Sequence, residues 1–411
     1  MSHNNLKYDV AIVGGGIIGL ATAYKLQLKY PNLSLIVLEK ENEVAFHQTG
    51  RNSGVIHSGL YYKPGSYRAK NCVDGRKQLV KFAKKHKITH DICGKIVLAT
   101  NDKETLKLKS LKKNGKKNGL KGLKLLYNKE IKTIEPFAEG KSALFVPESG
   151  IIDYKGVTKK LSELITTINP KSCVSTNSEV IHIEKEKLIL KDSVIQTKHS
   201  IFCGGLFADR LAKKDGVELD SKVVGFRGDY YNIKEKSLYK IKNLIYPVPN
   251  PQFPFLGVHF TRMFDGSVEC GPNAVFTFKR EGYTKTSFSW RDTWESLTFL
   301  GTLRLFFKHW RFGLTEYKRA FSKRLFLREL QKMVPSLKMD DLVVGKCGVR
   351  ATVLDIDGTI VEDFKIVKHN NNIHILNAPS PAATACLSIG DEVVNFINKN
   401  FNLDKKNNGK K

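Results

Sequence analysis

Three glycines and one acidic residue near the N-terminus have a spacing that can bind a dinucleotide. Gly14, Gly16 and Gly19 form the pattern G-x-G-x-x-G, and Glu39 follows at the distance typical of this fingerprint. The first glycine permits a tight turn, the second lets the backbone approach a pyrophosphate, and the third lets a helix pack closely on a strand. A carboxylate at Glu39 can accept hydrogen bonds from ribose hydroxyls and disfavours a 2′-phosphate. The pattern therefore predicts bound FAD or NAD and leaves the choice between them open.

A second segment that could contact a ligand follows at residues 47–59. It reads His47-Gln48-Thr49-Gly50-Arg51-Asn52-Ser53-Gly54-Val55-Ile56-His57-Ser58-Gly59. Its glycines allow the backbone to pass close to a ligand, and its hydroxyl and amide side chains can donate to phosphates or to a polar ring edge. Three glycines and two histidines are poorly suited to core packing, so we expect this segment to line the ligand site.

These residues need a strand, a helix and a second strand to position them. An apolar, β-branched run at 8–13 predicts a buried parallel strand, residues 20–28 predict a helix, and residues 33–38 predict the next strand. The helix N-terminus then presents unpaired N–H groups and its positive dipole end to the phosphates. The fingerprint therefore occurs in the structural context that its chemistry requires.

The composition excludes several classes of protein. The chain has 411 residues with a formal net charge of +28, and its lysines are dispersed without a nucleic-acid-binding motif, so we expect no nucleic-acid partner. Its seven cysteines form no C-x-x-C pair, which fits a reducing compartment and neither a disulfide framework nor a metal site. The first strand begins at Tyr8, and no apolar run is long enough to span a bilayer. We expect a cytoplasmic protein without a signal or transit peptide, with peripheral binding at the inner membrane as an open alternative.

Beyond the two N-terminal motifs, further blocks run nearly to the end of the chain. They include Tyr61–Ser66, Gly225–Tyr230, Ile245–Pro249, Phe253–His259, Gly271–Ala274, Phe278–Tyr283, Gly348–Ala351 and Asn377–Thr384. With Gly14–Gly19, Glu39-Lys40 and residues 47–59, they resemble the FAD-dependent L-2-hydroxyglutarate dehydrogenases and oxidases, which belong to the D-amino-acid-oxidase-like flavoproteins. One departure is Arg51, which stands where many members have histidine. If Arg51 faces the flavin, its charge would alter the electrostatics there.

The resemblance implies an α/β fold in which a Rossmann-like FAD-binding domain is interrupted by a substrate domain with a mostly antiparallel sheet. The expected FAD-binding domain is discontinuous and comprises residues 1–75, 142–215 and 340–402. The expected substrate domain comprises residues 76–141 and 216–339, and residues 403–411 form a basic tail. Such an interrupted arrangement explains why both ends of the chain resemble parts of one nucleotide-binding unit.

The implied activity is oxidation of L-2-hydroxyglutarate to 2-oxoglutarate by hydride transfer to flavin N5, with electrons passed to a quinone or to oxygen. A related flavoprotein that oxidises another small anion, such as glycerol 3-phosphate or an amino acid, is the alternative. Val180 is expected to contact the adenine, and the segment that begins at Ser380 is expected to donate N–H groups near the flavin O2. The expected cofactor-binding residues are Gly14, Gly16, Gly19, Glu39, Lys40, Thr49, Asn52, Ser53, Gly54, Val180, Gly204, Ser380, Pro381, Ala382 and Ala383.

Oxidation of a 2-hydroxy acid also needs a base for the hydroxyl proton and cations for the carboxylates. Histidine is the favoured base because it titrates near neutrality, and His57 and His259 are equal candidates. Arg350 matches the position at which the wider superfamily places a carboxylate-binding arginine. The candidates for further substrate contacts, each of which could instead be structural, are Arg227, Tyr230, Tyr231, Arg262, Lys279 and Arg280.

The segment 288–312 combines aromatic and basic residues. It contains all three tryptophans of the chain, and Arg304, Lys308 and Arg311 lie among its apolar residues. A basic helix rich in aromatic residues can lie in a membrane interface, whereas a helix buried against its own domain is the alternative. A membrane surface and a quinone are therefore candidate partners, together with a small dicarboxylate substrate.

Overall fold

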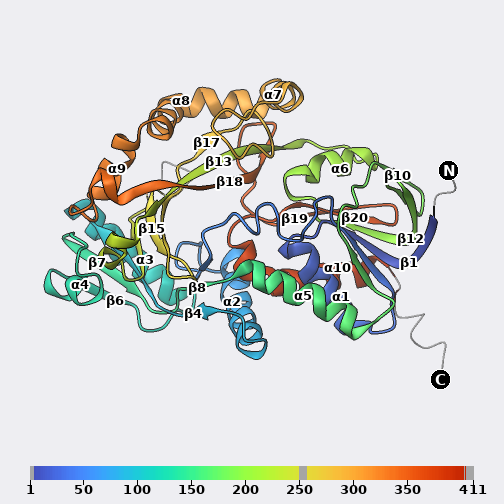
Figure 1. The fold of residues 1–411 in the computed structure, drawn as a ribbon, viewed down its shortest axis with the longest axis horizontal. Coiled ribbons are helices and arrows are strands. Elements are labelled where there is room, and N and C mark those ends of the chain that lie inside the picture. The colour runs from blue at the N-terminus through green and yellow to red at the C-terminus, as the bar shows by residue number, and fades with distance from the viewer. Residues whose placement is uncertain (1–3, 250–256, 402, 404–411) are drawn as a thin grey trace.

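The computed structural model describes residues 4–249, 257–401 and 403. Residues 253–256 of the sequence block Phe253–His259 and residues 404–411 of the expected basic tail lie outside the described residues. Two large sheets dominate the part that is described, and Figure 1 shows the first on the right and the second on the left.

The first sheet contains the N-terminal strand and has eight strands. Its main order is β10-β11-β12-β1-β2-β9, and β20 pairs with both β12 and β19. Strand β1 pairs in parallel with β2 and β12, as the dinucleotide fingerprint requires. The strands are β1 (Asn4–Val13), β2 (Leu35–Leu38), β9 (Cys173–Ser175), β10 (His182–Glu184), β11 (Lys187–Ile189), β12 (Ser193–Phe202), β19 (Lys365–His369) and β20 (Asn372–Asn377).

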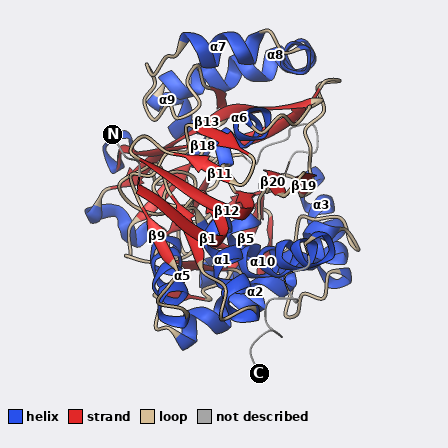
Figure 2. Cartoon of the chain, turned by 90° about the vertical axis from the view of Figure 1, so that its right-hand side faces the viewer, coloured by secondary structure: helices blue, strands red, loops and turns tan. Residues whose placement is uncertain are grey.

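Four helices cover one face of this sheet. They are α1 (Ile17–Lys29), α2 (Tyr67–Lys85), α5 (Tyr154–Ile168) and α10 (Ala382–Asn400). Buried Val10 and Ile12 of β1 share an apolar core with Leu20 of α1, Leu161 of α5 and Val393 of α10. Helix α6 (Ala208–Lys214) lies on the other face, and Figure 2 shows it on the opposite side of β1 and β12 from α1, α2, α5 and α10. Ile183 of β10 and Leu188 of β11, at the edge of the sheet, pack in the apolar cluster of this face. The first sheet is therefore covered on both sides, which is the usual arrangement for buried parallel strands.

The second sheet has nine strands and is mostly antiparallel. Its order is β17-β13-β16-β15-β14-β5-β7-β6, with β18 paired to β13, and only β14 and β5 run parallel among these pairs. The strands are β5 (Lys95–Ala99), β6 (Lys124–Tyr127), β7 (Ser142–Val146), β13 (Ser221–Ile233), β14 (Leu244–Pro247), β15 (His259–Arg262), β16 (Val268–Gly271), β17 (Val275–Phe276) and β18 (Leu342–Asp355). This sheet matches the expected architecture of the substrate domain.

Sheet membership differs from the domain boundaries expected from the sequence. Strands β7 and β18 belong to the second sheet, although residues 142–146 and 342–355 were assigned to the FAD-binding domain. Helix α2 packs against α10 on the first sheet, although residue 76 was expected to begin the substrate domain. A third, small sheet joins β3 (Val55–Ile56), β8 (Gly150–Ile152) and β4 (His90–Asp91). The chain therefore passes between the two large sheets more often than the expected domain boundaries imply.

The remaining helices lie outside both sheets. They are α3 (Asp102–Lys117), α4 (Lys129–Ile134), α7 (Trp290–Leu297), α8 (Leu300–Phe321), α9 (Lys323–Gln331) and the short turns η1 (Gly205–Phe207), η2 (Glu235–Lys240) and η3 (Met339–Asp341). Helices α7 and α8 form one outer edge of the molecule, at the top of both overall views. Among the described residues, no helix is both long enough and apolar enough to cross a bilayer.

Candidate active site

One large cavity, with a volume of about 1300 Å³, extends from the first sheet to the second. At one end it is lined by Gly14 and Glu39, which follow β1 and β2 of the first sheet. At the other end it is lined by Tyr246, His259 and Arg350, which lie on strands of the second sheet. A cavity of this size that spans both sheets can hold a dinucleotide and a small substrate together.

The glycine fingerprint forms a cradle in which larger residues have no room. Gly14 has φ +116°, and a Cβ there would lie 2.4 Å from the carbonyl oxygen of Cys203. A Cβ on Gly19 would lie 2.0 Å from the carbonyl oxygen of Gly14. Because the strand and the helix approach this closely, the N-terminus of α1 points into the cavity where a pyrophosphate would bind.

Two side chains from outside the fingerprint complete this end of the cavity. The Thr49 hydroxyl accepts a hydrogen bond of 3.0 Å from the backbone N–H of Ile17, in the first turn of α1. The Glu39 carboxylate accepts hydrogen bonds from the backbone N–H groups of Gly15 (2.7 Å) and Glu41 (3.0 Å). These donors fix the carboxylate at the edge of the cavity, where its remaining lone pairs can accept from ribose hydroxyls.

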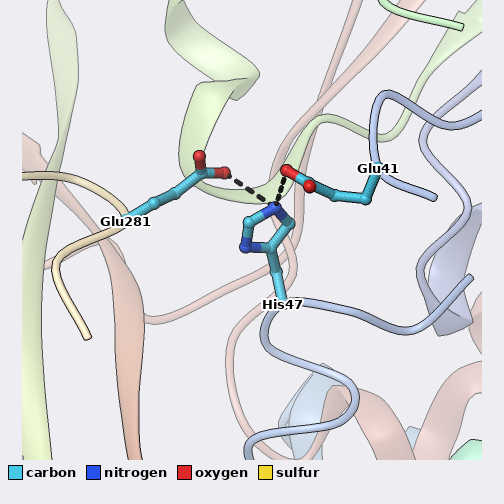
Figure 3. Close-up of side chains that lie close together, drawn as sticks. All are labelled: Glu41, His47 and Glu281. Atoms are coloured by element: carbon cyan, nitrogen blue, oxygen red, sulfur yellow. Dashed lines mark hydrogen bonds and ion pairs between the residues drawn. The ribbon is translucent and has the colours of Figure 1, made fainter. Parts of the chain in front are cut away.

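A cluster of charged side chains at this end of the cavity links the loop after β2 to the segment that follows β17 (Figure 3). The His47 Nε2 atom lies 2.9 Å from a Glu41 carboxylate oxygen and 3.1 Å from a Glu281 carboxylate oxygen. These three side chains are also close enough to hold a metal ion. However, the Lys40 ammonium lies 2.5 Å from Glu281 and 3.3 Å from Glu41, so a lysine of the chain already pairs with both carboxylates. We therefore interpret the cluster as a structural link and not as a metal centre.

The segment that precedes α10 is tied to the loop containing His57. The Thr384 hydroxyl accepts from the backbone N–H of His57 (3.0 Å) and lies 2.9 Å from the Tyr154 hydroxyl. The Tyr154 hydroxyl in turn donates to the carbonyl oxygen of Val55 (2.9 Å). These buried bonds bring residues 55–57 and 384 together although more than 300 positions separate them in the sequence.

Both histidines expected to act as base line the second end of the cavity. The His259 Nδ1 atom lies 2.9 Å from the carbonyl oxygen of Gly257, and the ring stacks on Tyr246 at a centroid distance of 3.9 Å. Because a carbonyl oxygen can only accept, Nδ1 carries the proton in neutral His259, and Nε2 keeps its lone pair. His259 is thus held in the tautomer that can accept a proton at Nε2.

Burial and nearby positive charge keep both histidines uncharged. Burial, together with the positive charges of Lys95, His259 and Arg68, lowers the pKa of His57 to about 3. The pKa of His259 is lowered to about 4, because burial and the charges of Lys95 and Arg350 outweigh the opposing hydrogen bond to Gly257. At neutral pH each ring is therefore uncharged and keeps a nitrogen lone pair, although its proton affinity is low while no anion is bound.

Arg350 and Arg68 are the two guanidinium groups beside these histidines. Arg350 lines the cavity from β18 and donates to the carbonyl oxygen of Asn273 at 3.2 Å. Arg68 lines the cavity from the first turn of α2 and donates to the carbonyl oxygen of Ser380 at 2.7 Å. Arg350 was expected from the sequence, whereas Arg68 was not. The sequence signal that could have indicated Arg68 is its place two residues after the block Tyr61–Ser66.

Four residues expected to contact substrate do not line the cavity, and this part of the expectation is corrected. Arg227 is buried and paired with Asp229 (2.8 Å), and Arg262 pairs with Asp91. Tyr231 packs in the apolar core of the second sheet, and the Lys279 side chain is exposed. The two arginines are therefore engaged in ion pairs, Tyr231 in apolar packing and Lys279 with solvent, all away from the cavity lining.

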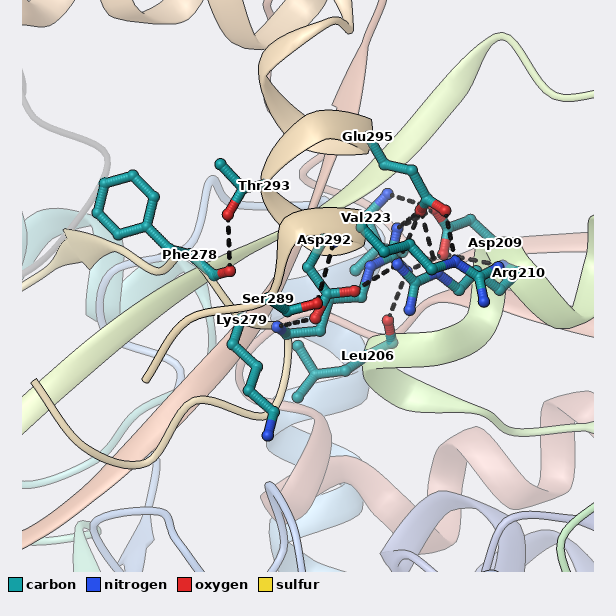
Figure 4. Close-up of polar contacts among 12 residues, drawn as sticks. Leu206, Asp209, Arg210, Val223, Phe278, Lys279, Ser289, Asp292, Thr293 and Glu295 are labelled. Carbon is teal, nitrogen blue, oxygen red and sulfur yellow. Dashed lines mark hydrogen bonds and ion pairs between the residues drawn. The ribbon is translucent and has the colours of Figure 1, made fainter. Parts of the chain in front are cut away.

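Arg280, a further candidate, belongs to a buried network of ion pairs that Figure 4 shows around Asp209, Arg210, Asp292 and Glu295. Both carboxylate oxygens of Asp209 accept from the Arg280 guanidinium, and the second bond is 2.8 Å long. Arg210 pairs with Asp292 (2.5 Å) and Glu295 (2.8 Å). The network holds α6 against α7, so Arg280 connects structural elements and does not face a substrate.

Of the expected cofactor-binding residues, all except Gly54 line the cavity. Asn52 lines it but uses its side-chain amide within its own loop, where it donates to the carbonyl oxygen of Thr49 (2.8 Å) and accepts from the N–H of Gly54 (2.8 Å). Tyr61, Tyr62 and Tyr246 also line the cavity beside the histidines, and the sequence analysis did not assign them.

Comparison with known proteins agrees with this geometry. Residues 9–395 match the family described as DAO, FAD dependent oxidoreductase. The chain is 45% identical to an L-2-hydroxyglutarate dehydrogenase from Indibacter alkaliphilus, over 96% of this chain and 100% of that protein. It is 39% identical to the mitochondrial L-2-hydroxyglutarate dehydrogenase of Homo sapiens, over 98% of this chain and 91% of that protein.

Solved structures share the fold at lower sequence identity. The structure of dithionite-reduced L-alpha-glycerophosphate oxidase from Mycoplasma pneumoniae with FAD bound has a TM-score of 0.76, with 24% identity over 95% of each chain. An L-proline dehydrogenase from P. horikoshii has a TM-score of 0.71 with 14% identity, over 96% of this chain and 94% of that one. These likenesses concern the fold alone.

Proposed function

This chain belongs to the family of FAD-dependent oxidoreductases, and we propose that it oxidises L-2-hydroxyglutarate to 2-oxoglutarate. The observation that carries the proposal is a pair of histidines that line the cavity uncharged at neutral pH, the half-buried His57 under the charge of Arg68 and the buried His259 under the charge of Arg350. A dicarboxylate with one hydroxyl group needs these functions: a proton acceptor at its centre and a cation for each end. The full-length relatives named for this reaction support the same assignment.

The cavity fits FAD, the cofactor of this family. The cradle of Gly14 and Gly19 excludes a Cβ and leaves backbone N–H groups for a pyrophosphate, and the fixed Glu39 carboxylate can hold a ribose. Ser380 and the residues that follow it line the opposite end, beside the histidines. When bound, FAD supplies the hydride acceptor for the carbon that carries the hydroxyl group.

The protein's own part in the reaction is proton transfer and orientation. His259 removes the hydroxyl proton at Nε2, because the Gly257 carbonyl oxygen holds the ring proton on Nδ1. His57, whose backbone N–H is fixed by Thr384, is the alternative base. The resulting imidazolium lies close to the Arg350 charge, so the negative substrate must remain bound to compensate for it.

The two carboxylates of the substrate are assigned to the two arginines. Arg350, beside His259, binds the carboxylate next to the reacting carbon, and Arg68, beside His57, binds the distal one. Arg68 also lies over the face of Tyr62, with 4.8 Å between the guanidinium carbon and the ring centroid, which limits its movement.

The test is anaerobic mixing of purified holoenzyme with L-2-hydroxyglutarate while the absorbance of the oxidised flavin is followed. We expect bleaching with the L-enantiomer and formation of 2-oxoglutarate in equal amount. The controls are the D-enantiomer and glycerol 3-phosphate, the substrate class of the alternative function. Bleaching with glycerol 3-phosphate or an amino acid, but not with L-2-hydroxyglutarate, would disprove the substrate assignment.

We further propose that the outer edge formed by α7 and α8 binds an anionic membrane surface. Trp290 and Phe307 are 81% and 82% exposed, and Trp294 and Trp310 are also exposed. Arg304, Lys308 and Arg311 lie on the same segment, and the whole chain carries a net charge of +28. Exposed aromatic side chains beside cations are suited to the interface of an anionic bilayer. At such a surface the flavin could be reoxidised by a membrane quinone, whereas oxygen would serve away from it.

Sedimentation with vesicles tests this surface. We expect the protein to pellet with vesicles of anionic lipid at low salt, and to pellet less at high salt or with neutral lipid. Replacement of Trp290, Phe307 and Trp310 with serine should abolish pelleting and preserve flavin bleaching. Phe306 is unsuitable for this test because its ring packs on Phe276 at 5.2 Å. Unchanged pelleting by the folded triple variant would exclude this edge as the membrane-binding surface.

A further inference from the structure

Lys95 is a buried cation that neither the sequence motifs nor the proposed reaction uses. It is the first residue of β5, and it is 2% exposed. Its Nζ atom lies 4.5 Å from the ring centroid of Tyr61 and 4.7 Å from that of Tyr246. Among the residues that the structure describes, no carboxylate pairs with it. A buried ammonium between two aromatic faces, with no carboxylate beside it in the described part of the chain, is costly, which indicates that its charge has a use.

The two tyrosines separate Lys95 from the cavity. Tyr61 and Tyr246 line the cavity, whereas Lys95 does not. The other face of Tyr246 belongs to the reaction site, since the Tyr246 ring stacks on His259 at 3.9 Å. The ammonium therefore lies one aromatic layer behind the position of the substrate, and its field reaches the cavity through material of low polarity.

The groups that face Lys95 do not neutralise it. Burial raises the pKa of Tyr61 and of Tyr246, and it raises the pKa of Cys72 to about 12, so all three remain protonated and uncharged near pH 7. Burial lowers the pKa of Lys95 itself to about 7, and Cys72 opposes this shift. The positive charge is therefore present below about pH 7 and is lost as the pH rises through that value.

Lys95 acts on both candidate bases at once. Its charge lowers the pKa of His57 together with His259 and Arg68, and it lowers the pKa of His259 together with Arg350. These are the charged and titratable groups that act on the two rings from β5, α2, β15 and β18. Lys95 thus lowers the pKa of both histidines, whereas Arg68 lowers only that of His57 and Arg350 only that of His259.

We propose that Lys95 is a positioning residue whose charge, transmitted through Tyr61 and Tyr246, draws a dianionic substrate to the two histidines and tunes their proton affinity. The proposal rests on the proposed function, because it is the two carboxylates of the substrate that the charge attracts. It differs from a structural role, in which the ammonium would only hold the two tyrosine rings together. A structural role predicts no dependence on substrate charge.

The decisive variant is Lys95→Met, which keeps the length of the side chain and removes its charge. At pH 6.5 we expect the KM for L-2-hydroxyglutarate to rise about tenfold and kcat to change less. We expect the acid limb of kcat/KM to move to higher pH by about 0.5 to 1 unit, because a positive neighbour no longer disfavours the imidazolium. Lys124→Met, which removes an exposed lysine from β6 of the same sheet, is the matched control and should match the wild type.

Equilibrium binding provides a readout that needs no turnover. Glutarate, which lacks the reacting hydroxyl group, should perturb the flavin spectrum of the holoenzyme and bind about tenfold more weakly to Lys95→Met. Butyrate, with one carboxylate, should lose less affinity. An equal loss for both ligands would contradict an effect of charge on dianion recognition.

The wild-type enzyme and Lys95→Arg keep the proposal testable if Lys95→Met fails to fold. The wild-type KM should rise as the pH passes from 6 to 9, whereas Lys95→Arg, charged throughout, should show no such rise. A wild-type KM that is constant over this range would overturn the inference, as would a folded Lys95→Met enzyme with unchanged KM and acid limb. If the wild type does not oxidise L-2-hydroxyglutarate at all, the proposed function fails, and glutarate binding still tests Lys95.

Discussion

The two ends of the cavity satisfy their polar groups in opposite ways. At the nucleotide end, backbone N–H groups bind the Glu39 carboxylate, and Lys40 pairs with Glu41 and Glu281. At the reaction end, His259 and Lys95 are buried and His57 is half-buried, and none of the three has a carboxylate partner among the described residues. The first end is complete before a ligand arrives. At the second, Arg68 pairs with the exposed carboxylate of Glu362 (3.6 Å), and an anionic substrate would compensate the charge of Lys95.

This difference indicates what each end contributes. The nucleotide end, where the polar groups already have partners, is suited to a cofactor that remains bound through many turnovers. Cofactor binding there does not require shifted pKa values. At the reaction end, a buried cation without a carboxylate partner among the described residues costs stability. The same arrangement favours binding of an anionic substrate and keeps the histidines uncharged. The predictions below separate the two ends by whether a variant changes cofactor retention or substrate turnover.

Replacement of Gly14 with alanine should have the largest effect, and it should act on the nucleotide end. The new Cβ would lie 2.4 Å from the Cys203 carbonyl oxygen, at φ +116°. We expect purified protein without bound FAD, measured as the ratio of flavin absorbance to protein absorbance. Gly313→Ala is the control, because a Cβ there meets nothing within 4 Å. Full flavin content in Gly14→Ala would show that the cradle is wider than described.

Replacement of His259 with asparagine should reduce kcat by about 10² to 10⁴-fold while FAD remains bound. His57→Asn should cost less, because only His259 has a hydrogen bond that fixes its tautomer. The measurement is the rate of anaerobic flavin reduction at saturating substrate. A larger loss in His57→Asn would reverse the assignment of the base and leave the comparison between the two ends intact.

Replacement of Arg350 with leucine should lower kcat/KM by about 10² to 10³-fold, because a charge-assisted contact to a carboxylate is lost. Most of the loss should appear in KM if Arg350 binds the ground state and the transition state equally. Arg324→Leu, which removes an exposed arginine from α9, should match the wild type. A loss of FAD in Arg350→Leu would mean that Arg350 supports the cofactor instead of the substrate.

Replacement of His47 with alanine should have the smallest effect, about a few-fold weaker FAD binding. His47 lies between Glu41 and Glu281 and 2.5 Å from the Tyr283 hydroxyl, but Lys40 still pairs with both carboxylates when His47 is absent. The dissociation constant of FAD from apoprotein, measured by flavin fluorescence, checks this. A change in the acid limb of kcat/KM in this variant would show that the two ends are not independent.

The nucleotide end could be predicted from the sequence because its contacts are local in the chain. Gly14, Gly16 and Gly19 lie within one turn and the start of one helix, and Glu39 ends the next strand, so their spacing alone encodes the cradle. Thr49 follows at short range and caps the same helix. The alternation of strands and helices also indicated both sheets, although not that β7 and β18 would join the second.

The reaction end was predicted only in part. His57, His259 and Arg350 were found because they lie in recognisable blocks. Arg227, Arg262 and Lys279 were equally plausible by residue type, yet ion pairs or solvent satisfy them away from the cavity. Lys95 is one of 68 basic residues, and no local pattern marks it as buried. Residue type indicates which chemistry a side chain can perform, but not whether an acidic partner will neutralise it.

The sequence by itself therefore determined the cofactor class, the family and the elements that hold the pyrophosphate. The pyrophosphate site follows from short-range geometry: a turn, a helix N-terminus and an acid at the end of a strand. FAD and the family follow from the sequence blocks that resemble known flavoproteins along nearly the whole chain. Only the tertiary structure decided which cations line the cavity and in which direction the pKa values of the histidines shift. Those properties depend on strands and helices far apart in the chain, such as β5, β14, β15 and the first turn of α2, and their packing alone sets burial and distance.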